Sequence, residues 1–489
     1  MTEHFDVLIV GAGISGVGGA YHLTMQCPGT SFVLLESQGS FGGTWITHRF
    51  PGIRSDSDLH TFGYRFKPWT GAPIATAAEI LTYMHEVIEE NDLGRHIRYH
   101  HRIERASWSS EENRWTIEAI RTDTGEALSF MAGFLWMCQG YYRHSEGYTP
   151  DWKGMADFKG RIVHPQSWPD DLDYRGKRVV VIGSGATAAT IIPAMAPDCA
   201  HITMLQRSPT YFRIDRNAIP IAEELRKLQV DEAWVHEIVR RKIIYEQTAF
   251  AKRCVREPEA VKQELLAGIR EYVGGDYDVG KHFTPRYRPW QQRLAFVPDG
   301  DMFRAIADGR ASVVTDEIER FVETGILLKS GALLEADVIV TATGFNLCVL
   351  GDIDFTIDGK PLVFSETVTY RGMMFTGVPN LAWVFGYFRA SWTLRADLVA
   401  DFVCGLLNQM KARGAKRVVP TLRPQDADMP LLPWIDEENF NPGYMLRGMH
   451  LLPKRGDRPE WAHTQDYWSE KDEFAAIDFD DEVFVYGPS

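Results

Sequence analysis

Cysteine is scarce in this sequence, and the few cysteines that occur are far apart. No two of them stand in a C-x-x-C arrangement. Separated thiols disfavour a disulfide scaffold, a zinc site and a dithiol redox centre, so we predict no bound metal. The cysteines are Cys27, Cys138, Cys199, Cys254, Cys348 and Cys404.

The sequence also lacks an excess of positive charge and an uninterrupted apolar run. With 52 lysines and arginines against 66 acids, the net charge is −14, which argues against nucleic acid as a partner. Residues 179–197 are uncharged, but Gly183, Gly185 and Pro193 among them indicate a nucleotide loop and not a membrane span. We see no secretion signal. These absences predict a cytoplasmic enzyme, and 489 residues predict two or more domains.

A first glycine loop, residues 11–16, follows the apolar residues 7–10 and precedes a predicted helix. Gly11, Gly13 and Gly16 form the order G-x-G-x-x-G, which permits a tight turn, close approach of a pyrophosphate and close helix–strand packing. The next apolar run ends in Glu36, where a carboxylate accepts hydrogen bonds from an adenosine ribose. The alternative is a purely structural turn, but strand, helix and acid together predict a dinucleotide site for FAD.

A second glycine loop, residues 183–188, follows the apolar residues 179–182. After the next predicted strand come Arg207 and Ser208 in place of an acid, which suits the 2′-phosphate of NADPH. The alternative is that Arg207 is a solvated surface charge. The loop itself consists of Gly183, Ser184, Gly185, Ala186, Thr187 and Ala188.

Two similar apolar segments, residues 134–140 and 336–344, each end in a glycine turn and predict passages of the chain between two domains. We therefore predict an α/β fold with two Rossmann-like dinucleotide-binding domains, the second inserted in the first. The FAD domain is expected over residues 1–145 and 335–440, the NADP domain over 150–332, and a C-terminal extension over 441–489.

A helical insertion is predicted at residues 221–273, inside the NADP domain. This stretch is rich in Glu, Lys, Arg, Leu and Ala and has little glycine or proline. Its apolar side chains, including Trp234, Ile238, Ile243 and Ile244, are expected to cover the core. An alternative is that these helices wall a substrate tunnel.

Two longer patterns carry a family resemblance. Residues 158–170 read F-x-G-x-x-x-H-x-x-x-W-P-D, and residues 42–56 read G-G-x-W-x-x-x-x-F-P-G-x-x-x-D. Set among the two glycine loops, they resemble the type I Baeyer–Villiger monooxygenases, and nearly the whole chain resembles the ethionamide-activating subgroup. The first pattern supplies Phe158, Gly160, His164, Trp168, Pro169 and Asp170.

The resemblance implies an FAD-dependent enzyme that consumes NADPH and O2 and converts ketones to esters or lactones through a C4a-peroxyflavin. Oxidation of sulfides or thioamides is implied as well. The peroxide and the adduct that follows are anions, and arginine remains a cation near pH 7. By resemblance this cation is Arg293, and Asp56 orients it. The resemblance also implies contacts with NADP for Arg54 and Ser55, and contacts with FAD for Ser15, Glu36, Thr44 and Trp45. Gly43 and Ile103 are further implied cofactor contacts.

The resemblance places the pattern at 158–170 in the linker between the two domains, so we expect His164 to couple domain motion and not to transfer a proton. Gln292 stands where many family members have a lysine, so NADPH preference is expected to rest on Arg207 and Ser208. Residues 386–394 precede a predicted helix whose N-terminus is expected to cap the flavin.

Three alternative functions stay open. A flavin monooxygenase that oxidises sulfur or nitrogen needs no such arginine. A flavin disulfide reductase on the same double fold is disfavoured because no paired thiol is present. A nucleotide sensor without turnover is the third. The sequence leaves the substrate and the oligomeric state undetermined.

Overall fold

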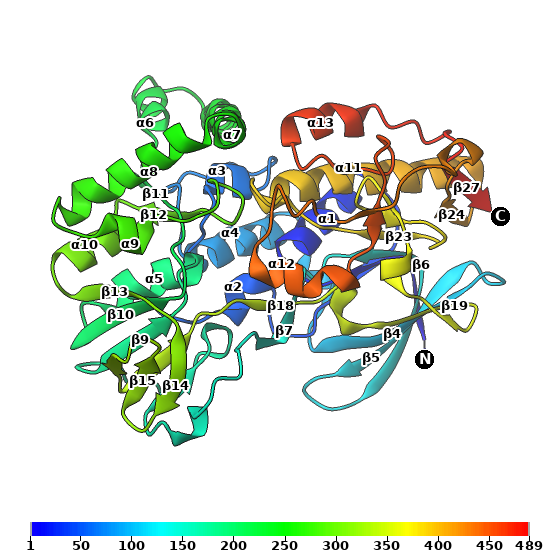
Figure 1. Ribbon diagram of the computed structural model, residues 1–489. Coiled ribbons are helices and arrows are strands. Elements are labelled where there is room, and N and C mark those ends of the chain that lie inside the picture. Colours follow the sequence, from blue (N-terminus) through cyan, green and yellow to red (C-terminus); the bar gives the residue numbers. More distant parts are fainter. Residues whose placement is uncertain (1, 488–489) are drawn as a thin grey trace.

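Two sheets with their helices lie side by side in the computed structural model, which describes residues 2–487 (Figure 1). The larger, or first, sheet has the strand order β20-β19-β4-β5-β6-β1-β2-β3, with β23 paired to β6. Its strands are β1 (Glu3–Val10), β2 (Phe32–Leu35), β3 (Ile97–Arg98), β4 (His101–Ser109), β5 (Arg114–Arg121), β6 (Ala127–Met137), β19 (Asp354–Ile357), β20 (Lys360–Pro361) and β23 (Leu381–Trp383).

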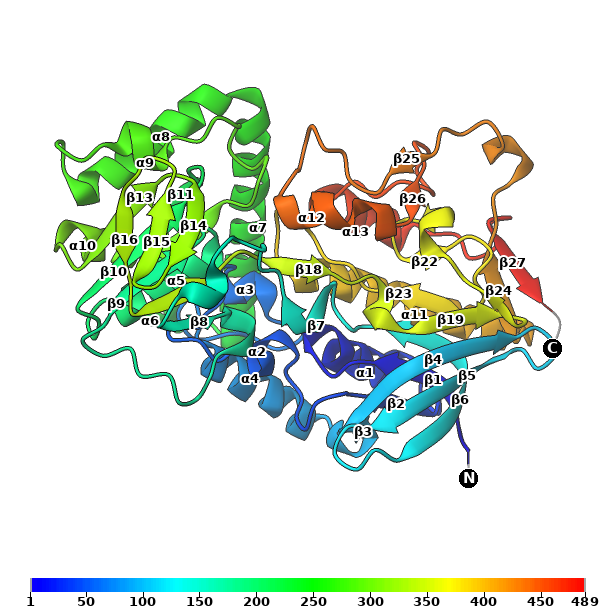
Figure 2. The same cartoon turned by 60° about the horizontal axis from the view of Figure 1, so that its bottom comes forward.

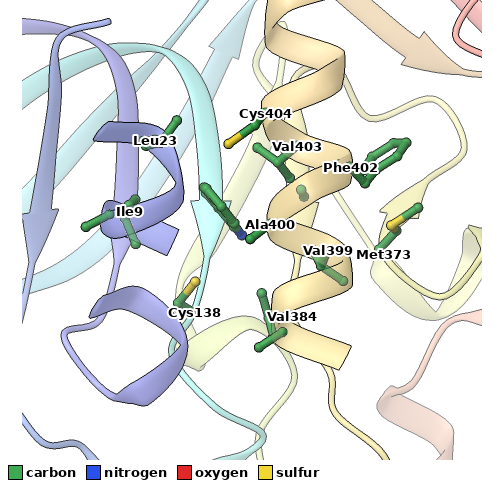
Figure 3. Packing of buried hydrophobic residues seen from close by; sticks show 14 of the residues in the cluster. Ile9, Leu23, Cys138, Met373, Val384, Val399, Ala400, Phe402, Val403 and Cys404 are labelled. Atoms are coloured by element: carbon green, nitrogen blue, oxygen red, sulfur yellow. The ribbon is translucent and has the colours of Figure 1, made fainter. Parts of the chain in front are cut away.

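The core of the first sheet begins with β1, whose last four residues are buried. Parallel strands covered on both faces read as continuous apolar runs, which is what residues 7–10 show. α1 (Ile14–Gln26) packs against α11 (Trp392–Arg413), and Figure 3 shows Leu23 of α1 near Val403 and Cys404 of α11. Each such fully buried apolar side chain contributes about 1.5–3 kcal/mol. α2 (Thr44–Thr47), α3 (Leu59–Phe62) and α4 (Ala77–Glu90) belong to the same N-terminal part.

The second sheet is wholly parallel, in the order β13-β10-β9-β17-β8. The predicted return to the FAD domain at residue 335 is wrong, because β17 is a central strand of this sheet. Its four residues are all buried, as both faces are covered. The strands are β8 (Arg161–Val163), β9 (Arg178–Ile182), β10 (His201–Gln206), β13 (Ala311–Thr315) and β17 (Val338–Thr341).

The chain crosses between the sheets along two strands that pair with each other. β7 (Tyr142–Gly147) leaves the first sheet after β6, and β18 (Phe345–Leu347) leaves the second after β17. They run antiparallel, with Phe345 opposite Gly147, and Figure 2 shows them between the two halves of the molecule. The two crossings therefore form one joint.

Three helices form the helical insertion: α6 (Pro220–Lys227), α7 (Glu232–Arg256) and α8 (Pro258–Val273). The buried Arg240 of α7 ties them to α3 by donating hydrogen bonds to the carbonyl oxygens of His60 and Gly63 at 2.9 and 3.0 Å. Ile244 is buried, but Trp234 is 65% exposed and Ile238 is exposed. The expectation that these last two cover the core is wrong, because they lie on the outer face of α7.

Smaller elements complete the second half of the molecule around the second sheet. They are α5 (Ala186–Met195), β11 (Phe212–Asp215), α9 (Val279–Phe283), β12 (Ala295–Pro298), α10 (Asp301–Ala307), β14 (Ile318–Val322), β15 (Gly325–Leu328) and β16 (Leu333–Glu335).

The C-terminal segment returns to the first half and joins its core. Trp461 and Val483 are fully buried in the same cluster as Val7. Glu470 is buried and forms an ion pair with Arg395 of α11 at 2.9 Å, so this segment is part of the core of the first half. Its elements, with two preceding hairpin strands, are β21 (Thr369–Tyr370), β22 (Met374–Phe375), β24 (Arg417–Pro420), β25 (Leu432–Pro433), α12 (Gly443–Gly448), β26 (Lys454–Arg455), α13 (Tyr467–Ala475) and β27 (Phe484–Gly487).

Some features are absent from residues 2–487. None of the helices there combines the length and apolar character that a membrane crossing requires. The same part of the chain holds no cluster of three or more His, Cys, Asp or Glu side chains suited to a metal ion, and all six cysteines are free thiols.

Candidate active site

A cavity of ≈ 1210 Å³ is lined by residues from both halves of the molecule, including both glycine loops. Of the predicted site residues, its lining includes Gly11, Gly13, Ser15, Glu36, Gly43, Thr44, Trp45, Arg54, Asp56, Ile103, His164, Gly185, Ala186, Thr187 and Arg293. The lining does not include Gly16, Ser55, Gly183, Ser184, Ala188, Arg207, Ser208, Phe158, Gly160, Trp168, Pro169 or Asp170.

The first glycine loop is closed and tightly packed. A Cβ on Gly16 would lie 1.9 Å from the carbonyl oxygen of Gly11, so only glycine lets α1 approach β1 this closely. Glu36 is buried at the end of β2, and its carboxylate accepts hydrogen bonds from the amides of Ala12 and Gln38, each at 2.8 Å. A buried acid held at the rim of a glycine loop fits the ribose of a dinucleotide.

Aromatic side chains form a wall of the cavity beside this loop. Trp392, the first residue of α11, donates a hydrogen bond from Nε1 to Oγ of Ser15 at 2.8 Å and stacks on Tyr141 at 5.4 Å between ring centroids. The hydroxyl groups of Tyr142 and Thr44 lie 2.9 Å apart. Sequence reasoning missed both tyrosines, although they follow the carboxyl end of β6, where ligands of such sheets bind.

The second glycine loop is more open. Gly183 must be glycine, since its φ is +127° and a Cβ would lie 2.3 Å from the carbonyl oxygen of Ala342. A Cβ on Gly185 would instead meet empty space. Ser184 bonds Thr210 through their hydroxyl groups at 2.7 Å, and Ala188 is buried in the core. Three residues of the loop, including Gly185, face the cavity.

The cationic residues predicted for NADP differ in their surroundings. Arg207 and Ser208 are exposed just after β10, and Arg207 has no carboxylate within 4.0 Å in the described part of the chain. Arg54 lines the cavity but makes two hydrogen bonds to the carboxylate of Asp301, at 2.5 and 3.3 Å. Ser55 is buried, and its hydroxyl accepts from the amide of Ala75, so its position does not support the predicted NADP contact.

Asp56 and Arg293 meet in the cavity, although 237 residues separate them in sequence. Arg293 donates from Nε at 2.8 Å and from Nη2 at 2.5 Å to the same oxygen, Oδ2 of Asp56. Nη1 has no hydrogen-bond partner among residues 2–487. The side chain of Arg293 is 37% exposed and that of Asp56 is 29% exposed. The negative charge of Asp56 raises the pKa of Arg293 above its usual value, although burial opposes this, so the guanidinium is a permanent cation.

Two tyrosine side chains that line the cavity, Tyr141 and Tyr444, lie close enough to Arg293 for its charge to affect their pKa values. Burial raises the pKa of Tyr141, and it raises the pKa of Tyr444 well above the usual value, while the charge of Arg293 lowers both by less. Both therefore remain protonated and available as donors at neutral pH. Gln292, next to Arg293, donates to Oδ1 of Asn441 at 3.3 Å.

The pattern at 158–170 contains β8, the edge strand of the second sheet, and not a separate linker as expected; His164, just after β8, reaches the joint. A Cβ on Gly160 would lie 2.3 Å from the carbonyl oxygen of Asp337, and one on Gly147 of β7 would lie 1.9 Å from the ring of His164. Nδ1 of His164 accepts from the amide of Gln166 at 3.1 Å, while its Nε2 is buried without a partner. Phe158 and Trp168 pack with the two cores of the second half. The pattern thus belongs to the second sheet and contacts β7 through His164.

Residues 9–69 match the family "NAD(P)-binding Rossmann-like domain", and residues 74–220 match "Flavin-binding monooxygenase-like". The chain is 49% identical over 469 residues to the FAD-containing monooxygenase EthA of Mycobacterium tuberculosis (strain CDC 1551 / Oshkosh), covering 96% of this chain and 94% of the relative. It is 43% identical to the probable FAD-binding monooxygenase AlmA of Acinetobacter sp, covering 99% and 97%.

Among solved structures, an oxidized steroid monooxygenase bound to NADP superimposes with a TM-score of 0.78 at 24% identity, covering 99% of this chain and 100% of the other. The fold is therefore that of the monooxygenases with two dinucleotide-binding domains, as predicted. The chain belongs to the flavin-binding monooxygenase family, in the group of FAD-containing monooxygenases that includes EthA and AlmA. The predicted family resemblance is confirmed.

Proposed function

We propose that this protein is an FAD- and NADPH-dependent Baeyer–Villiger monooxygenase that converts ketones to esters or lactones. One oxygen atom of O2 enters between the carbonyl carbon and its neighbour, the other leaves as water, and NADPH supplies the two electrons. The observation that carries the proposal is the Asp56–Arg293 pair, which presents a permanent cation in the cavity that both glycine loops share.

The cavity residues suit the two cofactors. The first glycine loop with Glu36, Thr44 and Trp45 would hold FAD, and residues 185–187 with Arg207 and Ser208 outside the cavity would hold NADPH. When bound, FAD takes electrons from NADPH and activates O2, which no amino-acid side chain can do. In this proposal residues 2–147 and those after β18 form the FAD domain, and the second sheet with the helical insertion forms the NADP domain.

Arg293 would stabilise the negative charge that develops on the carbonyl oxygen of the ketone when an oxygen atom adds to the carbonyl carbon. At about 4 Å and an effective dielectric constant near 20, a unit charge pair is worth roughly 4 kcal/mol, or about three decades in rate. Asp56 would hold the guanidinium in place through two hydrogen bonds to one oxygen. The protonated phenols of Tyr141 and Tyr444 would exclude water beside it.

We propose that His164 helps to hold the joint between the two halves in position and does not transfer protons. Burial lowers its pKa below the usual value, so it is neutral at pH 7, and its ring packs against Gly147 at the joint. A rearrangement of the joint would move the second glycine loop relative to the first, as a cycle in which NADP changes position requires.

The enzyme is also proposed to be cytoplasmic, where NADPH is supplied. All six cysteines are free thiols, which is the usual state in a reducing compartment.

The test is product formation by the FAD-loaded protein with NADPH, O2 and 2-octanone. We expect an ester, and only hydrogen peroxide across a panel of ketones and thioethers would overturn the proposal. Arg293→Ala is expected to keep flavin reduction by NADPH and to lose ester formation by about three decades. Arg213→Gln, which removes an arginine outside the cavity, is the control.

Thioethers and thioamides give the second arm of the same assay, since the family relatives are described only as monooxygenases. Oxidation at sulfur develops no negative charge on a carbonyl oxygen, so it is expected to survive Arg293→Ala better than ester formation does. Equal losses for both substrate classes would show that Arg293 has a structural role.

A further inference from the structure

A second cavity, of ≈ 280 Å³, lies between the helical insertion and the first half of the molecule. One face of α7 forms a wall, because residues such as Ile244, Thr248 and Val255 recur at helical spacing. The other walls are formed by residues around the start of α11, namely Arg389, Ala390 and Leu394, and by residues 464–467 around the start of α13. Figure 1 shows α7 and α13 next to each other at this place.

The charge around this cavity is positive, in a protein with a net charge of −14. Lys252, Arg256 and Arg389 line it, against Asp466 alone. None of the three cations has a carboxylate within 4.0 Å in the described part of the chain, whereas most arginines elsewhere are paired. The carboxylate of Asp466 is engaged by the amide of Trp468 at 3.1 Å. Three cations therefore face a single carboxylate around this cavity, and none of the three is paired with it.

Arg389 is the innermost of these cations. Its side chain is half-buried, its Nε is buried without a hydrogen-bond partner, and its Nη2 donates only to the carbonyl oxygen of Asn439. Burial and then the neighbouring Arg288 lower its pKa to about 10, so it still carries its charge at pH 7. A half-buried, unpaired guanidinium is costly unless an anion pairs with it. Lys252 and Arg256 are exposed at the mouth.

The second cavity adjoins the first. Ala390 lines both cavities. Tyr387 lines the first and packs in one cluster with Ile244 and Leu394, which line the second. The two cavities therefore meet at Ala390, and the side chains around this place are mostly apolar.

We propose that the second cavity binds the carboxylate end of the substrate, so that the preferred substrates are oxo acids, ketones whose aliphatic chain ends in a carboxylate. Arg389 pairs with the carboxylate in a bidentate geometry, Ile244 and Leu394 contact the chain, and the ketone lies beyond Ala390 near Arg293. The oxo acid class rests on the proposed function; the anion site does not.

The kinetic test compares 2-octanone with 7-oxooctanoate, which has the same chain ending in a carboxylate. We expect kcat/KM to be at least about tenfold higher for the oxo acid and to fall with added salt, while 2-octanone is insensitive to salt. The methyl ester of 7-oxooctanoate should behave as 2-octanone does. Arg389→Gln should remove the preference and change kcat/KM for 2-octanone less than about threefold.

A double variant, Lys252→Gln with Arg256→Gln, removes the two exposed cations at the mouth of the second cavity. It should weaken the salt dependence of kcat/KM for the oxo acid and leave the buried residues unchanged. The matched control is Arg241→Gln, on the same helix, 74% exposed and outside the cavity lining. Equal kcat/KM for the neutral and anionic ketones in the parent enzyme, or equal losses for both in Arg389→Gln, would overturn the proposal.

Binding of octanoate to the full-length protein, measured by calorimetry, separates this inference from the proposed function. Octanoate should bind the parent and the Arg241→Gln control equally and bind Arg389→Gln at least about tenfold more weakly. If octanoate behaves so while no ketone is oxygenated, the anion site stands and the proposed function fails. If ketones are oxygenated but octanoate binds parent and Arg389→Gln alike, only the anion site fails.

Discussion

The two glycine loops begin with the same G-x-G order but are built differently. The first packs so tightly that Gly16 has no room for a methyl group, and its acid, Glu36, is buried with both carboxylate oxygens bonded to backbone amides. The second has Ala188 in the third place, and its cation, Arg207, is exposed.

Under the proposed assignment of FAD to the first loop and NADPH to the second, this difference distinguishes a cofactor that stays bound from one that exchanges. Where the binding groups are part of the folded core, a ligand is retained as firmly as the core itself, whereas exposed groups can release a ligand in every cycle. We therefore expect perturbations of the first loop to act on stability and FAD content. Perturbations of the second loop should act on affinity for NADPH.

Gly16→Ala should have the largest effect, because its methyl group would lie 1.9 Å from the carbonyl oxygen of Gly11. We expect a loss of about 3 kcal/mol or more in the free energy of unfolding, and little bound FAD. The matched change in the second loop, Ala188→Gly, should cost about 1 kcal/mol. Thermal unfolding and flavin absorbance per chain measure both. Equal losses would erase the contrast between the loops.

Glu36→Ala should have the next largest effect, because the amides of Ala12 and Gln38 lose their acceptor. A loss of about 2 kcal/mol is expected, seen as an FAD dissociation constant about 30-fold higher, with KM for NADPH unchanged. The exposed Glu112→Ala is the control. A change in KM for NADPH alone would contradict the assignment of FAD to the first loop.

Arg207→Gln should raise KM for NADPH about tenfold, leave kcat unchanged and leave KM for NADH unchanged, because only NADPH carries the 2′-phosphate. Arg175→Gln, an exposed arginine at the opposite ends of strands β9 and β10, serves as the control. If KM rises equally for NADPH and NADH, Arg207 contributes only a positive charge that attracts both nucleotides and does not contact the 2′-phosphate.

The smallest effect concerns pH and the first loop's side of the cavity. Burial, and then the charges of His144 and His164, lower the pKa of His48 from 6.5 to about 4. Between these two pKa values His48 is protonated in the unfolded chain and neutral in the folded protein. The free energy of unfolding therefore falls as the pH falls through 6.5 toward 4. Between pH 7 and pH 6 this amounts to roughly 0.7 kcal/mol, measurable by thermal unfolding. His48→Gln should remove this part; an unchanged pH profile would show that other groups cause it.

Much of the site could be predicted from sequence because its motifs report backbone requirements. Gly16 and Gly183 occupy positions where a side chain collides. Asp56 stands at a fixed place in the pattern at 42–56, and Arg293 was assigned by the family resemblance. The apolar run of β17 gives no sign of the sheet to which it belongs, so its placement in the first domain was wrong.

Contacts between distant segments could not be predicted where no family resemblance reports them. Asp301 accepts a hydrogen bond from the guanidinium of Arg54 although 247 residues separate the two, and no local pattern predicts that pairing. The helical spacing of Trp234 and Ile238 shows that α7 has an apolar face, but not whether another element covers it. Tyr444 reaches the cavity from the C-terminal segment, where no motif marks a site.

The nested topology has a consequence for synthesis on the ribosome. The second sheet is complete once Thr341 has emerged, since its five strands lie within residues 161–341. The first sheet must wait for β23, and the core that contains Val7 also needs Phe484. Domains usually fold in the order of their appearance. Here the inserted unit can finish first, while the strand made earliest waits for nearly the last residues of the chain.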